Sequence, residues 1–69
     1  MAGTQPLSPR ELEVLKLLAS GLTLAAIAAE LGVHRGTVAT HSSRAYRKLG
    51  VGAAHQAIVE AHRLGLIEL

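Results

Sequence analysis

The sequence contains no cysteine, which excludes a disulfide framework and a zinc site built on thiolates. Nothing in it indicates an oxidising compartment, so we expect an intracellular, cytoplasmic protein. The longest uninterrupted apolar run, residues 24–29, is far shorter than the about 18 residues that a membrane span needs. The first residues also lack the basic segment followed by an apolar one that marks a secretion signal. We therefore expect a soluble chain with no membrane partner.

Acidic side chains are absent from the stretch HRGTVATHSSRAYRKLG, residues 34–50. It holds four Lys or Arg and two His, whereas all five acids of the chain lie outside it. The net charge is only +2, yet the isoelectric point of 9.7 exceeds the value of about 9 that indicates an anionic partner. A helix lying against DNA avoids carboxylates because phosphates repel them. A solvated face on a structural bundle gives the same pattern, and spacing alone leaves both interpretations open.

Arrangements that support catalysis or metal binding are also missing. Glu11 and Glu13 are two residues apart on an expected helix and so point in different directions. The four histidines fall into pairs seven residues apart, but no acid or thiol joins them at metal-ligand spacing, and no phosphate-binding glycine loop occurs. We therefore expect no enzyme, no metal and no cofactor. We interpret His41 as a partly buried side chain that hydrogen-bonds to backbone.

Capping residues and apolar spacing predict an all-α fold of four helices. The first helix begins at Ser8, where Glu11 completes a capping box, and ends near Ser20. The second follows the cap Thr23 and ends at Leu31, where a glycine stops it. A short helix, a glycine-containing break and a longer helix together give the outline of a helix-turn-helix.

The third helix is expected over residues 35–49 and the fourth over residues 54–64. At 100° per residue, the third helix has an apolar face and an opposite polar face. The apolar face holds Val38, His41, Ala45 and Leu49, and the polar face holds Gly36, Thr40, Ser43 and Arg47. In the fourth helix and after it, we expect burial of Ala54, Ala57, Ile58, Ala61, Leu64, Leu66 and Ile67.

Residues 1–6 show no periodicity and end in proline. We interpret them as a disordered linker, either natural or left by cloning, and residues 7–69 as the single folded domain. At the start of the third helix, His34 occupies the cap position, where it is a poor substitute for Ser or Asp. We therefore expect the start of that helix to fray until DNA orders it.

Four blocks of the sequence, LSPRELEVLKLLASGLT, IAAELGV, GTVATHSSRAYRKLGV and AHRLGLI, together resemble the LuxR-type, or GerE-like, helix-turn-helix domain of the NarL and FixJ group. The similarity spans Leu7 to about Ile67. It implies a four-helix DNA-binding domain, usually the output domain of a bacterial transcriptional regulator that follows a receiver or ligand-sensing domain. It also implies a homodimer formed through the fourth helix. The recognition helix would then be residues 35–49, placed in the major groove of double-stranded DNA.

The sequence departs from the family pattern at several positions where DNA contact is expected. The family commonly has Lys where this chain has Ala25 and Ala39, and Arg, Asn and Arg where it has Gly52, Ala53 and Ala54. Fewer cations mean fewer phosphate contacts. The departures favour an alternative, a protein-interaction or dimerisation module that keeps the fold but has lost strong DNA binding. The promoter-recognition end of a sigma factor shares the outline but fits the first and last blocks less well.

The expected DNA-binding residues lie at the start of the second helix and along the polar side of the third. Gly36 removes side-chain bulk where a DNA strand approaches. Hydroxyls and guanidiniums can reach phosphates or base edges, and Ala39 or the methyl group of Thr40 can touch a thymine methyl. The predicted set is Thr23, Gly36, Thr37, Ala39, Thr40, Ser43, Arg44, Arg47 and Lys48.

On the fourth helix, His55, Val59 and His62 form a stripe away from the core residues. Because the resemblance implies that protomers pair along this helix, we expect the stripe at a two-fold contact. Acidification would charge the histidines and weaken that contact. A half-exposed valine between solvated imidazoles is the other interpretation of the stripe, and the sequence leaves it open.

Overall fold

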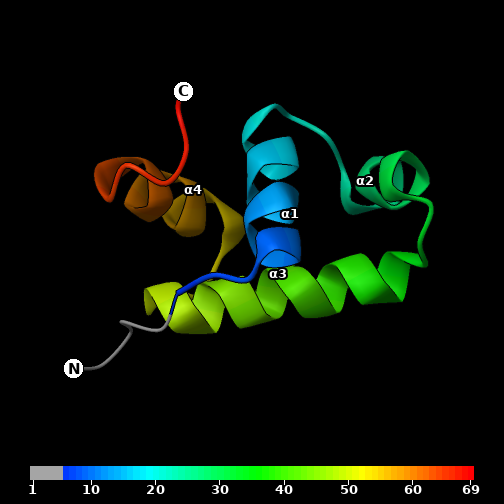
Figure 1. The fold of residues 1–69 in the computed structure, drawn as a ribbon, viewed down its shortest axis with the longest axis horizontal. Helices are drawn as coiled ribbons and strands as arrows, with labels where there is room; N and C mark the ends of the chain where they lie inside the picture. The colour runs from blue at the N-terminus through cyan, green and yellow to red at the C-terminus, as the bar shows by residue number, and fades with distance from the viewer. Residues whose placement is uncertain (1–5) are drawn as a thin grey trace.

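The computed structural model describes residues 6–69. Over that range the chain forms four helices and no strand (Figure 1). They are α1 (Pro9–Ala19), α2 (Leu24–Leu31), α3 (Arg35–Leu49) and α4 (Ala54–Arg63). The prediction of an all-α, four-helix fold is confirmed. The expected linker at residues 1–6 lies outside the described residues except for Pro6, which is exposed.

Helix α1 begins with the reciprocal capping that the sequence predicts. The backbone N–H of Glu11 donates to Ser8 Oγ at 3.1 Å, and the backbone N–H of Ser8 donates to Glu11 Oε1 at 2.9 Å. Pro9 occupies the first helical position, where its missing N–H costs no hydrogen bond. The carboxylate of Glu11 is therefore held in place at the first turn of the helix.

The turn between α2 and α3 is closed by backbone hydrogen bonds. Thr23 Oγ1 accepts from the N–H of Ala26 at 3.1 Å and caps α2 as predicted. Gly32 then adopts a φ of 67°, which glycine reaches without a steric penalty, and the N–H of Val33 donates to the carbonyl of Ala28 at 3.0 Å. Helix α3 follows at once, with His34 as a cap that makes no side-chain hydrogen bond.

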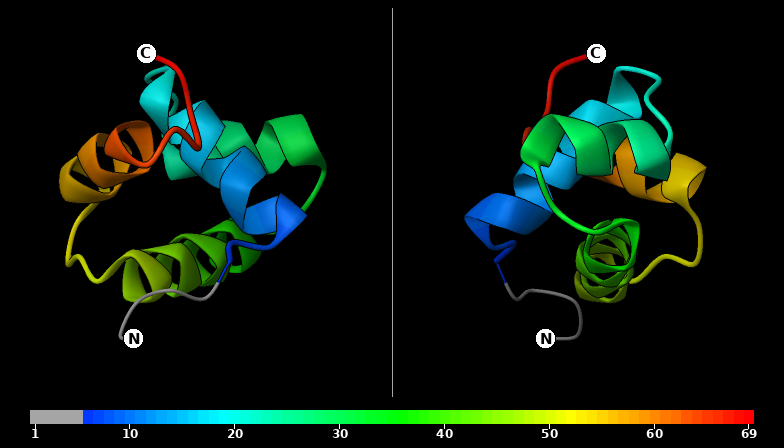
Figure 2. Two further views of the ribbon diagram at one scale, coloured as in Figure 1. Left: turned by 60° about the vertical axis from the view of Figure 1, so that its left-hand side comes forward. Right: turned by 90° about the vertical axis from the view of Figure 1, so that its right-hand side faces the viewer.

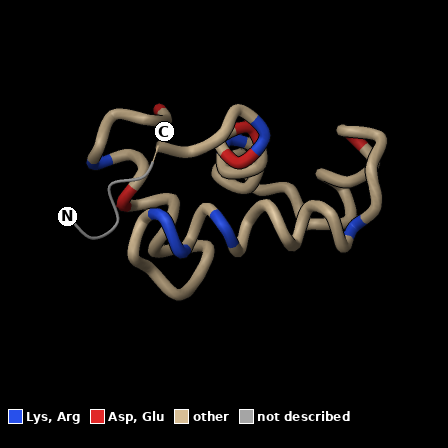
Figure 3. Tube along the Cα trace, turned by 60° about the horizontal axis from the view of Figure 1, so that its bottom comes forward, with Lys and Arg blue, Asp and Glu red and all other residues tan. Residues whose placement is uncertain are grey.

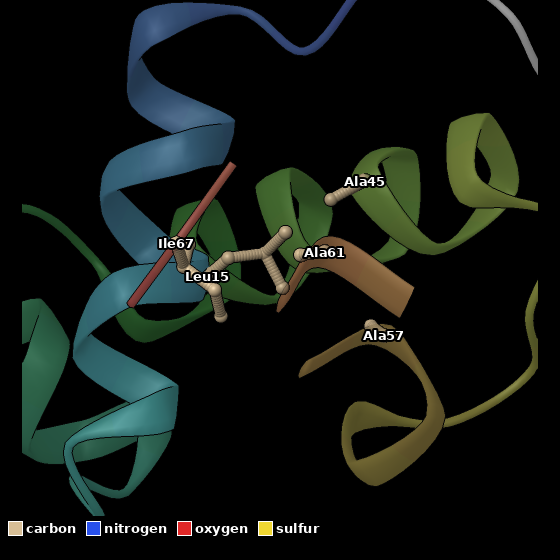
Figure 4. Packing of buried hydrophobic residues seen from close by; sticks show 5 residues of the cluster. All are labelled: Leu15, Ala45, Ala57, Ala61 and Ile67. Atoms are coloured by element: carbon tan, nitrogen blue, oxygen red, sulfur yellow. The ribbon is translucent and has the colours of Figure 1, made fainter. Parts of the chain in front are cut away.

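Two clusters of buried side chains hold the helices together. One joins α1, α2 and α3 and consists of Val14, Ile27, Ala28 and Val38. The other joins α1, α3, α4 and the chain end, and consists of Leu15, Ala45, Ala57, Ala61 and Ile67. In the second cluster the side chain of Leu15 extends toward Ala61, and the fully buried side chains of α3 and α4 in this cluster are alanines (Figure 4). Small side chains at these positions let α3 and α4 approach α1 closely.

Helix α3 lies along one edge of the molecule, and the other three helices are on the same side of it (Figures 1 and 2). Val38 and Ala45, on the side of α3 that faces these helices, are fully buried. Among residues 6–69, nothing covers the opposite side of α3, which is therefore open to solvent along its length.

The chain after α4 differs from the sequence-based expectation. Leu64 and Leu66, predicted to be buried, are 50% and 39% exposed, whereas Ile67 is 5% exposed. Helix α4 ends at Arg63, and Gly65 turns the chain with a φ of 77°. The N–H of Leu66 then donates to the carbonyl of Ala61 at 2.9 Å. This tight turn directs Leu64 and Leu66 outward and returns only Ile67 to the core.

Candidate nucleic-acid interface

The outward side of α3 gathers most of the residues predicted to contact DNA. Ala39 is half-buried, and the others on this side are exposed. The exposed residues of the predicted set on α3 are Gly36, Thr37, Thr40, Ser43, Arg44 and Arg47. Their spacing places them opposite the buried Val38 and Ala45. One continuous helical surface therefore carries hydroxyls, guanidiniums and methyl groups together.

A shallow hollow lies on this surface. It has a volume of about 410 Å³ and is lined by Ala39, Thr40, Ser43, Arg44 and Arg47. Methyl groups, a serine hydroxyl and two guanidiniums thus border the same space. These groups match the base edges in the major groove. Thymine offers a methyl group for apolar contact, and guanine offers two acceptors to an arginine.

Arginine charge on α3 is not neutralised within the described part of the chain. Arg35, Arg44 and Arg47 are exposed, and none of them forms an ion pair within residues 6–69. The exposed Arg10, on α1, pairs instead with Glu13 at 3.1 Å. Figure 3 shows Lys and Arg along the tube of α3 and no acidic residue there. The outward guanidiniums of α3 are therefore available to an external anion.

Arg35 was not in the predicted set, although the structure leaves it exposed at the start of the same helix. It is the first residue of α3, exposed and adjacent to Gly36. Two signals in the sequence could have identified it: its charge within the acid-free stretch, and its position at the start of the recognition helix, where a phosphate is favoured.

Two of the hydroxyl groups predicted to contact DNA already form a hydrogen bond within the protein. Thr40 Oγ1 donates to the carbonyl of Gly36 at 3.0 Å, so its hydrogen is engaged and its methyl group and acceptor capacity remain. Thr23 Oγ1 accepts from the N–H of Ala26, so its own hydrogen is left to donate. Thr40 can therefore contact a thymine methyl or accept a hydrogen bond from a base, and Thr23 can donate to a phosphate oxygen.

Gly36 has no internal reason to be glycine. A Cβ placed there meets no atom within 4 Å, and its φ is not positive. The fold would therefore accept a side chain at this position. The absence of a side chain leaves the backbone of the first turn of α3 open to close approach from outside.

Lys48 does not lie with the outward set. Its Nζ is 2.8 Å from Glu11 Oε1, and the side chains are 23% and 4% exposed respectively. Burial raises the pKa of Glu11, but hydrogen bonds from Lys48 and from the Ser8 backbone, with the positive charge of Lys48, outweigh it and lower that pKa. The structure thus places the ammonium of Lys48 against α1, in contrast to the expectation that it faces DNA.

His41 is half-buried, as expected. Its buried Nδ1 has no hydrogen-bond partner in the described part of the chain, so this atom does not form the expected bond to backbone. Ser42, which the sequence did not single out, is buried and donates to the carbonyl of Ala39 at 2.9 Å.

The stripe on α4 is exposed to solvent. His55, Val59 and His62 are all exposed, Val59 by 51%. Next to it lies a second open hollow of about 410 Å³, which includes His55 and Val59 and extends to the loop at residues 50–52. An exposed valine beside such a hollow offers apolar surface to a partner.

Within residues 6–69, no group of three or more His, Cys, Asp or Glu side chains lies close enough together to hold a metal ion. Over the same residues, none of the helices has the length and apolar character required to cross a bilayer.

Residues 5–61 match the family model described as bacterial regulatory proteins of the luxR family. The chain belongs to this family. Its members are DNA-binding transcription regulators and not enzymes, so the resemblance seen in the sequence and the expected output-domain function are confirmed.

Individual relatives agree with this assignment. The chain is 50% identical over 62 residues to the probable transcriptional regulatory protein NarL of Mycobacterium tuberculosis, covering 90% of this chain and 29% of that protein. It is 46% identical over 63 residues to the spore germination protein GerE of Bacillus subtilis, covering 91% of this chain and 85% of GerE. The crystal structure of the response regulator ChrA, of a heme-sensing two-component system, superposes with a TM-score of 0.87 at 43% identity over 91% of this chain and 31% of ChrA. The chain thus spans about a third of the length of NarL and ChrA.

Proposed function

We propose that this luxR-family domain binds double-stranded DNA with α3 in the major groove and α2 against the phosphate backbone. The observation that carries the proposal is the charge of α3: Arg44 and Arg47 on its outward side and Arg35 at its start are exposed and unpaired within residues 6–69, and the helix contains no acid. Duplex DNA carries about one negative charge per 1.7 Å of its axis, so it attracts such a surface whatever the base sequence.

Sequence preference arises from the smaller side chains between these arginines. The methyl groups of Ala39 and Thr40 fit against thymine methyls, and Ser43 reaches a base edge or a phosphate. The exposed Thr37 and the open first turn at Gly36 meet a backbone phosphate from the same side. The arginines would thus supply most of the affinity and the smaller groups most of the selectivity.

Two domains acting together would bind more tightly than one. Three phosphate contacts give a slope of only about −2.7 in a plot of log affinity against log salt, which is typical of a weak binder. Pairing through His55, Val59 and His62 on α4 would place two copies of α3 on two half-sites and double the number of contacts. The exposed Val59 and the hollow beside it support this pairing.

The whole regulator would include more than this domain. NarL and ChrA are about three times as long as the matched region, which supports a receiver or ligand-sensing domain upstream. Bacterial DNA lies in the cytoplasm, so a DNA-binding output domain acts there.

A protein-interaction module is the second candidate function. It is favoured by Ala25 and Ala39, which stand where family members commonly have Lys; Ala25 is exposed and Ala39 is half-buried on the DNA-facing side. A domain of this kind would keep the four-helix fold and bind duplex DNA no better than an unrelated protein of similar charge.

Titration of labelled duplex DNA at several salt concentrations separates the two functions. DNA binding predicts measurable affinity for a random duplex at low salt, a linear loss of log affinity with log salt, and enrichment of a preferred site in selection from a random library. Failure to bind at low salt, together with failure to enrich any site, would leave the interaction module as the better account.

A further inference from the structure

One ion pair of the described residues joins two different helices. Lys48 Nζ of α3 lies 2.8 Å from Glu11 Oε1 of α1, whereas the pairs Arg10–Glu13 and Arg63–Glu60 each connect residues three apart on the protein surface. The carboxylate of Glu11 also accepts from the N–H of Ser8 at 2.9 Å. One buried oxygen atom therefore ties the start of α1 to the last turn of α3.

We propose that Lys48 is a positioning residue for DNA recognition: by holding Glu11 it fixes the orientation of α3, and with it the presentation of Arg44 and Arg47. This inference rests on the proposed function, since it concerns how α3 meets DNA. It differs from the sequence-based expectation, in which Lys48 itself touches the phosphate backbone.

The burial of Glu11 explains why Lys48 stays on the protein. If the ammonium moved to a phosphate, a carboxylate that is only 4% exposed would keep the single hydrogen bond from Ser8. Removing one partner of a buried ion pair is strongly destabilising because the remaining charge has neither water nor a counter-ion. Water and salt screen a phosphate at the protein surface, so it attracts the ammonium of Lys48 less strongly than the buried carboxylate of Glu11 does.

The packing around the second half of α3 explains why an ion pair is needed to orient it. The fully buried side chains there are Ala45 of α3 and Ala57 and Ala61 of α4, and the half-buried Tyr46, Leu49 and Ile58 pack around them. Apolar contacts have no directional preference, so by themselves they permit small rotations and shifts of one helix against another. A directional hydrogen bond between two charged groups removes that freedom.

The last turn of α3 carries both the ion pair to α1 and an arginine of the proposed DNA surface. Lys48 points to α1, and the preceding residue Arg47 is exposed on the outward side and borders the hollow there. A change in the position of Lys48 therefore shifts α3, and with it Thr40 and Ser43, which border the same hollow, relative to the groove. Binding that depends only on phosphate charge tolerates such a movement, whereas contact with base edges does not.

The test uses Glu11→Gln, which removes the charge that holds Lys48 while Gln keeps the capping box, and the double variant Glu11→Gln/Lys48→Met, which removes both charges at similar volume. Lys48→Arg keeps the pair, and Glu13→Gln is the matched control on the exposed side of α1. Thermal unfolding is measured first. Affinities for a selected duplex and a random duplex are then measured over a range of salt, well below the unfolding temperature.

Positioning predicts that the ratio of specific to random affinity falls about tenfold in Glu11→Gln and in the double variant. It also predicts an unchanged salt slope in the double variant, and a ratio near that of the unmodified domain for Lys48→Arg and Glu13→Gln. If Glu11→Gln does not fold, the double variant decides, because replacement of both partners of a buried pair is well tolerated.

Two results would overturn the inference. A double variant whose ratio equals that of the unmodified domain would make the ion pair purely structural. A double variant whose salt slope is smaller by about 0.9 would make Lys48 a phosphate contact. Absence of any duplex binding by the unmodified domain is a different failure, that of the proposed function, and the inference would fall with it.

Discussion

Arg47 and Lys48 are neighbours in the chain, yet their charges have different partners. A step of 100° around α3 turns one to solvent and the other to the buried Glu11. From the sequence, both belong to a basic run and both were predicted at the DNA. Their roles differ because the carboxylate of Glu11, 37 residues earlier in the chain, binds Lys48. No local sequence pattern reveals a contact between residues so far apart.

At the residue scale, Arg47→Ala should lower the affinity for every duplex by a similar factor. The salt slope should fall by about 0.9, because one phosphate contact is lost. Fluorescence anisotropy with a selected and a random duplex measures both quantities. Arg10→Ala removes an exposed cation of α1 that is paired with Glu13, and serves as the control with an unchanged slope. Equal slopes for Arg47→Ala and the unmodified domain would remove Arg47 from the interface.

Thr40 should affect preference more than affinity. Thr40→Ser deletes the methyl group while retaining the hydroxyl that donates to Gly36. One methyl group buried against thymine is worth about 0.8 kcal/mol, or roughly fourfold in affinity. We therefore expect Thr40→Ser to weaken binding to the selected duplex by about that factor. Duplexes with deoxyuridine in place of thymine provide the measurement, since the variant should discriminate against them about fourfold less than the unmodified domain does. Equal discrimination by both proteins would contradict the methyl contact.

At the scale of the helices, the predictions succeeded where the signal was local. The caps Ser8 and Thr23 act through atoms three residues away, and the structure contains both hydrogen bonds. The path after α4 was predicted less well, because the turn at Gly65 and not the apolar character of Leu64 and Leu66 decides which side chain returns to the core. Apolar spacing identifies a helix face but does not follow the chain beyond the last turn.

The contact between α1 and α3 should make stability depend on pH. The pKa of Glu11 is lowered in the folded state from the ordinary value of 4.5. Since the unfolded chain then binds the proton more readily, the contribution of Glu11 is complete above pH 4.5 and is lost as pH falls through the lowered value. In urea unfolding between pH 3 and 7, the free energy of unfolding should therefore fall less at acid pH for Glu11→Gln than for the unmodified domain. Parallel curves for the two proteins would contradict this role of Glu11.

At the scale of the whole molecule, function depends on having two unlike sides. The acids at residues 11, 13, 30, 60 and 68 all lie outside α3, and that helix lies along one edge with its outward side uncovered (Figure 2). The 100° spacing predicted which side chains of α3 share that side. It did not predict the internal hydrogen bond of Thr40 or the buried Ser42, because both depend on side-chain geometry.

Pairing of two domains should depend on α4. Val59→Glu places a charge in the proposed contact, where burial is costly, and should weaken self-association on the order of tenfold. Leu64→Glu is the matched control, since Leu64 has nearly the same exposure as Val59 but lies beyond the end of α4. Sedimentation equilibrium measures both variants. Equal dimer constants for Val59→Glu and the unmodified domain would place the pairing surface elsewhere or show that none exists.

The central claim, that the outward side of α3 is the DNA surface, is tested most directly by mapping amide chemical shifts of the ¹⁵N-labelled domain during titration with a duplex at low salt. The account predicts the largest shifts in residues 35–47 and near Thr23, with little change at α4 beyond any effect of dimer formation. Shifts concentrated on α4 or on the turn at residues 64–68, or no shifts at any duplex concentration, would contradict it.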